Sequence, residues 1–255
     1  MTGFARHWGA GKKPALLLHC SLAHSGAWEG VAHALSDRLR LTAPDLVGHG
    51  RGPAHDPARD YHDQATEAAK GHLPDAPCHL IGHSFGATVA LRLALDHPGR
   101  VASLTLIEPV LFAAARGLPG WQRQMAEFAG LNAAFANGDQ ALATRLFLSV
   151  WGEGADFDDL PAAQRAYLQD RIWVVAASRA ALEDDAARLV PRLSQLTCPV
   201  LLIEGDRSPP VIAEIQGALG AAFPGHRRAQ IAAAGHMVPI THPRQVAAEI
   251  RELVA

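Results

Sequence analysis

The chain has 255 residues, of which 49% are hydrophobic and 19% charged, and its formal net charge is −2. This composition is typical of a globular protein with a large core, made as one domain or as a domain with an insertion. The near-neutral charge provides no basic surface for nucleic acid or an anionic membrane, and no apolar run is long enough to cross a bilayer. The segment from Met1 to Trp8 lacks the apolar centre of a secretion signal, so we expect a cytoplasmic protein.

The three cysteines, Cys20, Cys78 and Cys198, are widely spaced, and each borders a predicted buried strand. This placement favours small core residues over a disulfide framework or a metal site. The histidines of the N-terminal half show no metal-ligand spacing, and the glycine-rich run 48–52 does not fit a dinucleotide-binding fingerprint. We therefore expect neither a metal nor a cofactor.

The first two-fifths of the chain alternates between predicted strands and helices. Apolar runs predict buried strands, and helical spacing of apolar residues predicts the segments between them. The strands are expected at 15–19, 41–43, 78–81 and 103–107, and the helices at 28–39, 63–73 and 87–95. This rhythm predicts an α/β fold with a doubly wound, mostly parallel sheet, whose ligands bind beyond the carboxyl ends of the strands.

The rhythm changes after residue 110 and returns near residue 197. The segment 111–196 contains helical patterns only, at 122–135, 140–150, 162–177 and 179–189. We interpret it as an all-helical cap inserted between core segments 1–110 and 197–255. The aromatic residues offered as its apolar wall are Trp121, Phe128, Trp151 and Trp173. The sheet resumes with a strand at 199–203, a helix at 211–222, a strand at 227–231 and a final helix that begins at Pro243.

The run Gly82-His83-Ser84-Phe85-Gly86 matches the pattern G-x-S-x-G between a predicted strand and a predicted helix. In this turn the serine hydroxyl is pushed out above a sheet, and glycines allow the backbone to pack closely around it. The alternative is a core serine in an ordinary strand-to-helix loop. The strand-turn-helix context favours Ser84 as a nucleophile.

A nucleophilic serine needs a base, and in the order serine, acid, histidine the base comes last in the chain. His236 and His242 lie late enough. His236 follows Gly235 in a loop between the last strand and the last helix, whereas His242 precedes Pro243, where a helix-capping role fits better. We predict that His236 is the base.

These motifs, with His19 and the run from Asp45 to Arg51, resemble the α/β-hydrolase superfamily, specifically its cap-bearing serine hydrolases. The resemblance implies an oxyanion hole formed by the backbone N–H groups of Phe85 and Ser21, with Leu22 as a neighbour that could substitute. Family members usually carry a glycine where this chain has Cys20, which leaves the donor in this loop open.

The acid of the triad has two candidates. The family's usual aspartate position, three residues after the glycine that ends the strand, holds Ser208. Asp206 in the same loop is one candidate. Glu108, at the end of the strand 103–107, is the other, and a buried carboxylate at that point needs a partner. We favour Glu108.

The sequence therefore predicts a cofactor-independent serine hydrolase acting on a small ester or similar acyl compound, with no nucleic-acid or membrane partner. It leaves open whether the chain is a monomer or a homodimer. Carbon–carbon bond hydrolase, lactonase, thioesterase and cofactor-free haloperoxidase activities remain alternatives on the same triad. A receptor-like ligand-binding protein with little turnover is the alternative of another class.

Overall fold

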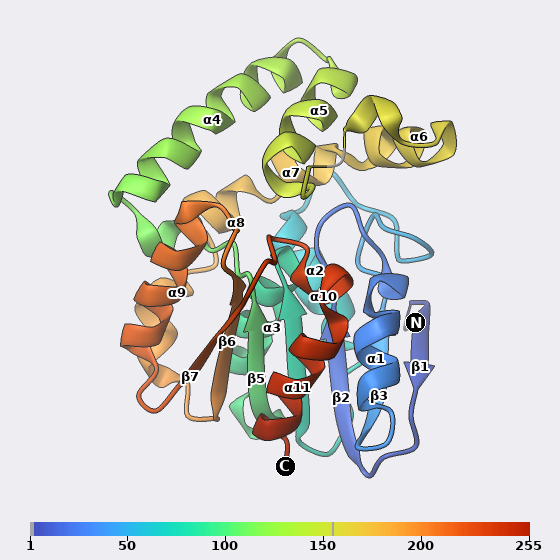
Figure 1. Cartoon of the computed structure of the whole chain (residues 1–255), viewed down its shortest axis with the longest axis vertical. Helices are drawn as coiled ribbons and strands as arrows, with labels where there is room; N and C mark the ends of the chain where they lie inside the picture. The colour runs from blue at the N-terminus through green and yellow to red at the C-terminus, as the bar shows by residue number, and fades with distance from the viewer. Residues whose placement is uncertain (1–2, 155) are drawn as a thin grey trace.

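Apolar strands form the centre of the molecule in the computed structural model, which describes residues 3–154 and 156–255 (Figure 1). Seven strands make one sheet in the order β1-β3-β2-β4-β5-β6-β7. Strand β1 pairs antiparallel with β3, and the other neighbouring strands pair in parallel. The strands are β1 (Ala5–Trp8), β2 (Lys13–Leu18), β3 (Leu39–Pro44), β4 (Cys78–His83), β5 (Val101–Ile107), β6 (Val200–Gly205) and β7 (Arg227–Ile231).

Helices cover both faces of this sheet, because successive strand residues point to opposite sides. Leu16 and Leu18 pack in a cluster with residues of helices behind the sheet, whereas Leu17 packs in a second cluster on the other face. The first face is covered by α2 (Tyr61–Lys70), α3 (Phe85–Asp96) and α9 (Pro210–Ala222), and the second by α1 (Glu29–Leu35), α10 (Val238–Thr241) and α11 (Pro243–Leu253). The doubly wound, mostly parallel sheet predicted from the sequence is confirmed.

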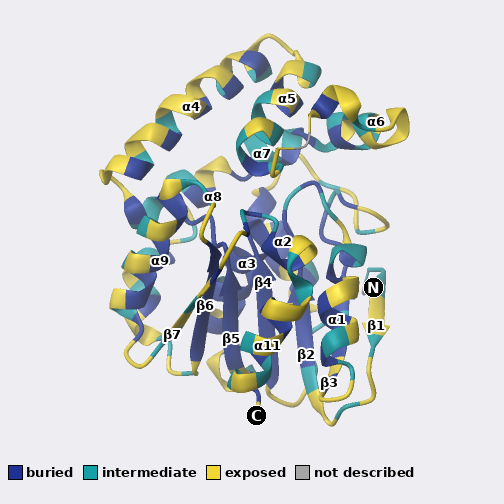
Figure 2. Cartoon of the chain, viewed as in Figure 1, coloured by how far each residue is buried: buried dark blue, intermediate teal, exposed yellow. Residues whose placement is uncertain are grey.

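The chain between β5 and β6 forms helices that lie above the carboxyl ends of the strands (Figure 1). We refer to segment 111–196 as the cap. Its outward faces are exposed, and its inner faces are buried toward the sheet (Figure 2). The cap helices are α4 (Pro119–Ala136), α5 (Gln140–Trp151), α6 (Ala162–Arg171), α7 (Trp173–Ala177) and α8 (Arg179–Glu183). The division of the chain at residues 110 and 196 stays a prediction.

Several predicted elements differ from the observed ones in extent. The single helix expected at 162–177 is interrupted at Ile172, and the one expected at 179–189 ends at Glu183. The first predicted helix is shorter, because Leu39 already begins β3. Strand β1 and helix α10 were not predicted: β1 is a four-residue edge strand without a fully buried residue, and α10 has only four residues.

The order of the parallel strands creates one point at the carboxyl edge of the sheet from which the chain continues in opposite directions. Chain order reverses beside β2, since β3 lies on one side of it and β4 on the other. The start of α3 packs closely here: a Cβ atom on Gly86 would lie 2.2 Å from the Leu18 carbonyl oxygen and 2.5 Å from that of His19. Both obstacles are backbone atoms, so only glycine lets α3 begin at this point.

Gly86→Ala is expected to lower the free energy of unfolding by at least about 2 kcal/mol, because the backbone of β2 cannot move away from the added methyl group. Gly217→Ala on α9 is the control, since a Cβ atom there meets nothing within 4 Å. That change should stabilise the protein by up to about 1 kcal/mol through helix propensity. Urea unfolding of both variants tests the contrast. A Gly86→Ala variant with an unchanged free energy of unfolding would contradict it.

Candidate active site

Ser84 stands at the turn between β4 and α3. Its backbone adopts φ 55° and ψ −121°, a conformation rare for residues with a side chain. The neighbouring glycines accommodate it: a Cβ atom on Gly82 would lie 2.4 Å from the Gly86 carbonyl oxygen. The side chain is only 6% exposed. The turn therefore holds the hydroxyl at the carboxyl edge of the sheet, beneath the cap.

His236 lies in the loop between β7 and α10, 5% exposed. Its Nε2 is 2.9 Å from Ser84 Oγ, and its Nδ1 is 3.0 Å from Glu108 Oε2. The His83 ring donates from Nε2 to the His236 carbonyl oxygen at 2.8 Å and so supports the loop from below. The Trp151 ring of the cap packs edge-on against the imidazole, with 4.6 Å between ring centroids.

Glu108 follows β5 with a φ of 51° and is completely buried. Its Oε2 faces His236, and its Oε1 accepts from the Gly205 N–H at 2.7 Å and the Ser208 hydroxyl at 2.6 Å. Ser208 occupies the position at which the sequence departs from the family pattern. It supports the glutamate that reaches His236 from the neighbouring strand, a role the sequence analysis did not anticipate.

Burial perturbs both ionisable partners. It lowers the pKa of His236 to about 3, which keeps the imidazole neutral. It raises the pKa of Glu108 to about 8, against the hydrogen bonds from Ser208 and Gly205, which lower it. With the proton of His236 on Nδ1, three donors converge on the Glu108 carboxylate, a pattern that fits its ionised form and leaves Nε2 free to accept from Ser84. The active ionisation state is therefore increasingly populated as the pH rises into the alkaline range, where Glu108 loses its proton.

Two of the predicted residues lie away from these contacts. Asp206 is exposed, and its side chain forms no hydrogen bond or ion pair with any residue the structure describes. The backbone N–H of Leu22 donates to His49 Nε2 at 3.0 Å, so it is already engaged. Across residues 3–154 and 156–255, the Ser21 N–H has no such partner, and Phe85 is the first residue of α3, whose N–H has no acceptor within the helix.

Buried histidines hold the loop that carries Ser21. His49 donates from Nδ1 to the Val47 carbonyl oxygen, and His19 donates from Nδ1 to that of Cys20, while His19 Nε2 accepts from the Leu46 N–H. Desolvation lowers the pKa of His19 to about 4 and that of His49 to about 3, so both rings stay neutral acceptors. The sequence signal for this role was the run from Asp45 to Arg51.

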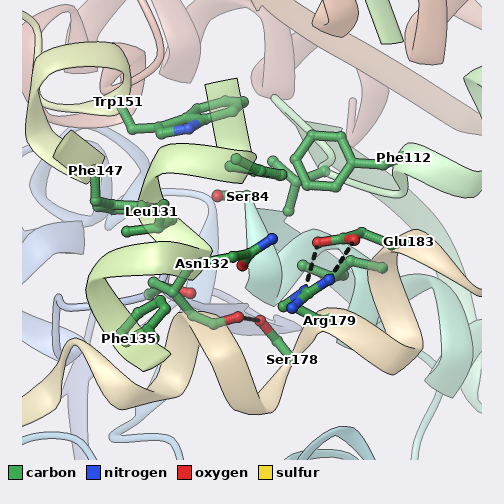
Figure 3. Close-up of a pocket in the computed structure, with 15 residues that line it drawn as sticks. Ser84, Phe112, Leu131, Asn132, Phe135, Phe147, Trp151, Ser178, Arg179 and Glu183 are labelled. Atoms are coloured by element: carbon green, nitrogen blue, oxygen red, sulfur yellow. Dashed lines mark hydrogen bonds and ion pairs between the residues drawn. The ribbon is translucent and has the colours of Figure 1, made fainter. Parts of the chain in front are cut away.

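A pocket lies between Ser84 and the cap (Figure 3). Its wall is mainly apolar, with aromatic side chains from α4 and α5. Asn132 and the ion pair of Arg179 with Glu183 form a polar part of the lining (Figure 3). The apolar lining includes Val110, Phe112, Phe128, Leu131, Phe135, Phe147 and Trp151.

Of the four cap aromatics singled out in the sequence, Phe128 and Trp151 line this pocket, whereas Trp121 and Trp173 pack elsewhere. Trp173 stacks on His55, with 4.5 Å between the ring centroids.

The three cysteines are free, and burial raises the pKa of Cys20 to about 12, which keeps it a thiol. Among the described residues, no cluster of three or more His, Cys, Asp or Glu side chains is placed to hold a metal ion, and no helix is long and apolar enough to span a bilayer.

Known proteins share the fold and part of the sequence of this chain. The model of the alpha/beta hydrolase fold family matches residues 13–243. The chain is 31% identical to a pimeloyl-(acyl-carrier protein) methyl ester esterase of Methylococcus capsulatus, over 96% of each chain. It is 29% identical to the lipase LipV of Mycobacterium tuberculosis, over 96% of this chain and 95% of that one.

A solved structure described as a hydrolase from Pseudomonas aeruginosa superimposes with a TM-score of 0.77. It is 24% identical in sequence and is matched over 98% of this chain and 93% of its own. At this identity the likeness concerns the fold.

Ser208→Ala is expected to move the acidic limb of the pH–rate profile upward by about one pH unit. The Ser208 hydroxyl stabilises the ionised Glu108, so its removal raises the pKa of a carboxyl group that burial already raises. Ser208→Thr, which keeps a hydroxyl, is the matched control. An unchanged acidic limb of the pH–rate profile in Ser208→Ala would show that this hydrogen bond does not affect the pKa of Glu108.

Proposed function

Since the chain belongs to the alpha/beta hydrolase fold family, we propose that it is a serine hydrolase that cleaves small carboxylic esters through Ser84, His236 and Glu108. The observation that carries this proposal is the continuous hydrogen-bonded chain from the Ser84 hydroxyl through the imidazole to a buried carboxylate.

In the first step Ser84 Oγ attacks the ester carbonyl carbon while His236 Nε2 takes the hydroxyl proton. Glu108 keeps the His236 proton on Nδ1 and stabilises the imidazolium that forms. The carbon–oxygen bond to the alcohol then breaks, and the alcohol leaves with the proton from Nε2. Ser84 is left as an acyl ester.

The carbonyl oxygen gains negative charge as the tetrahedral intermediate forms. We assign its stabilisation to the backbone N–H groups of Phe85 and Ser21, because each lacks an acceptor among the described residues and Ser21 lines the pocket beside Ser84. Two such donors contribute several kcal/mol to lowering the barrier. Leu22 is set aside as a donor, since His49 accepts its N–H.

Water completes the cycle. His236 Nε2 takes a proton from the attacking water, the carbon–oxygen bond to Ser84 breaks, and the proton returns to Ser84 Oγ as the carboxylic acid leaves. Burial keeps His236 neutral and so able to accept a proton, while Glu108 offsets the cost of the imidazolium that forms in each half.

The pocket indicates the class of substrate. Its apolar lining fits a hydrocarbon acyl chain, and the relatives named esterase and lipase act on esters. Location in the cytoplasm, and a monomeric or homodimeric state, rest on the sequence alone.

The ester hydrolysis itself is tested with nitrophenyl esters of increasing acyl length. We expect turnover of several chain lengths by the native chain, with acyl chains of several carbons preferred to acetate because they fill the apolar pocket. Ser84→Ala should lose turnover and labelling by a fluorophosphonate probe, which phosphonylates an activated serine and releases fluoride. Labelling of equal extent in Ser84→Ala would reject Ser84 as the nucleophile.

Glu108→Gln should lower kcat about a thousandfold, because the amide keeps the shape of the side chain but removes the charge that stabilises the imidazolium. Asp206→Asn is the matched control, and we expect near-normal kcat for this exposed residue. The opposite ranking in steady-state assays would transfer the acid to Asp206.

A further inference from the structure

The turn that ends α5 reaches down from the cap to the loop that carries His236. Glu153 Oε1 accepts hydrogen bonds from the Gly235 N–H and the Met237 N–H, both at 2.9 Å. These two amides flank His236 on either side. A cap side chain thus binds the backbone immediately before and after the histidine.

The local backbone is shaped for this contact. Glu153 has a φ of 54° and stands between Gly152 and Gly154 in a tight turn. A Cβ atom on Gly235 would lie 3.0 Å from Glu153 Oε1, so the absence of a side chain there gives the carboxylate its approach. Two residues earlier, the Trp151 ring packs against the imidazole itself.

The carboxylate also adds charge beside the triad. The groups around His236 are Glu108 from the end of β5, His83 from β4, and Glu153 from the cap. Glu204, which lies near Glu108, is paired with Arg228. The negative charge of Glu153 raises the pKa of His236 and that of Glu108, although burial remains the larger influence on both. Because Glu153 is exposed, solvent and salt weaken this effect.

We propose that Glu153 is a positioning residue, which holds the His236 loop in its catalytic geometry from the cap. The inference rests on the proposed function of Ser84 and His236. Glu153 does not line the pocket beside Ser84, so it acts through His236 and not through substrate binding.

A second hydrogen bond joins the cap to a loop of the site. Tyr167 of α6 donates from its hydroxyl to the Ala23 carbonyl oxygen at 3.1 Å, in the loop that carries Ser21. The cap is thus hydrogen-bonded to the loops of both the base and the proposed oxyanion donor. Glu153 links the seating of the cap to the orientation of the base.

The test compares Glu153→Gln, Glu153→Ala and, as the control, Glu127→Gln, which changes an exposed carboxylate of α4. The rate at which a fluorophosphonate labels Ser84 is followed across pH, with kcat and KM for a nitrophenyl ester measured in parallel. Gln keeps an acceptor oxygen, so Glu153→Gln should retain most of the rate, with its acidic limb a few tenths of a pH unit lower. Glu153→Ala should label roughly tenfold more slowly and lose kcat with KM unchanged, because the loop amides lose their acceptor.

The outcomes separate this inference from the proposed function. If the native chain does not label at Ser84, the proposed function fails. If the native chain labels and Glu153→Ala matches it in rate and pH profile, the role of Glu153 is overturned. A rise in KM without a fall in kcat would also overturn it, since that result places Glu153 in substrate binding. If the pH profile of Glu127→Gln shifted as far as that of Glu153→Gln, the shift would arise from general surface charge, and the role of Glu153 would be overturned.

Discussion

Left-handed backbone at a few loop positions is the constraint on which the site depends. Among the described residues other than glycine, seven have positive φ, and five of these lie at the site: Leu22, Ser84, Glu108, Glu153 and Ala233. Four of them stand in loops at the carboxyl edge of the sheet, and Glu153 stands in the cap turn that follows α5. Such conformations cost about 1–3 kcal/mol each and persist only where surrounding packing enforces them. The sheet thus sustains at its carboxyl edge a geometry that isolated loops would not adopt.

At the carboxyl edge of the sheet, burial and hydrogen bonds have opposite effects on the pKa of Glu108. Complete burial of Glu108 disfavours its charge, while Ser208, Gly205 and His236 supply donors that favour it. The side chain that replaces the usual aspartate therefore remains part of the network as a donor. A triad acid can move from one strand end to the next because parallel strands end at the same edge, within reach of one histidine.

The features that could be predicted from the sequence are those determined by a local pattern of residues. Buried parallel strands appear as continuous apolar runs, and the elbow has its own glycine spacing, so the sheet, Ser84 and His236 could be proposed early. Contacts between distant segments leave no such pattern. Glu153 is separated from Gly235 by more than eighty residues, and no spacing rule links Ser208 to Glu108. Strand β1 was not predicted because this edge strand lacks the continuous apolar run that identifies buried strands.

The buried histidines connect the site to the stability of the whole chain in acid. Burial lowers the pKa of His19, His49, His62, His83 and His236 below the ordinary value of 6.5. In the unfolded chain these rings take up protons as the pH falls through 6.5, whereas in the folded chain they do not until far lower pH. The free energy of unfolding therefore declines from about pH 6.5 downward, and unfolding in mild acid is accompanied by net proton uptake. The histidines that hold the Ser21 loop and serve as the base thus also set a lower limit to the pH at which the fold persists.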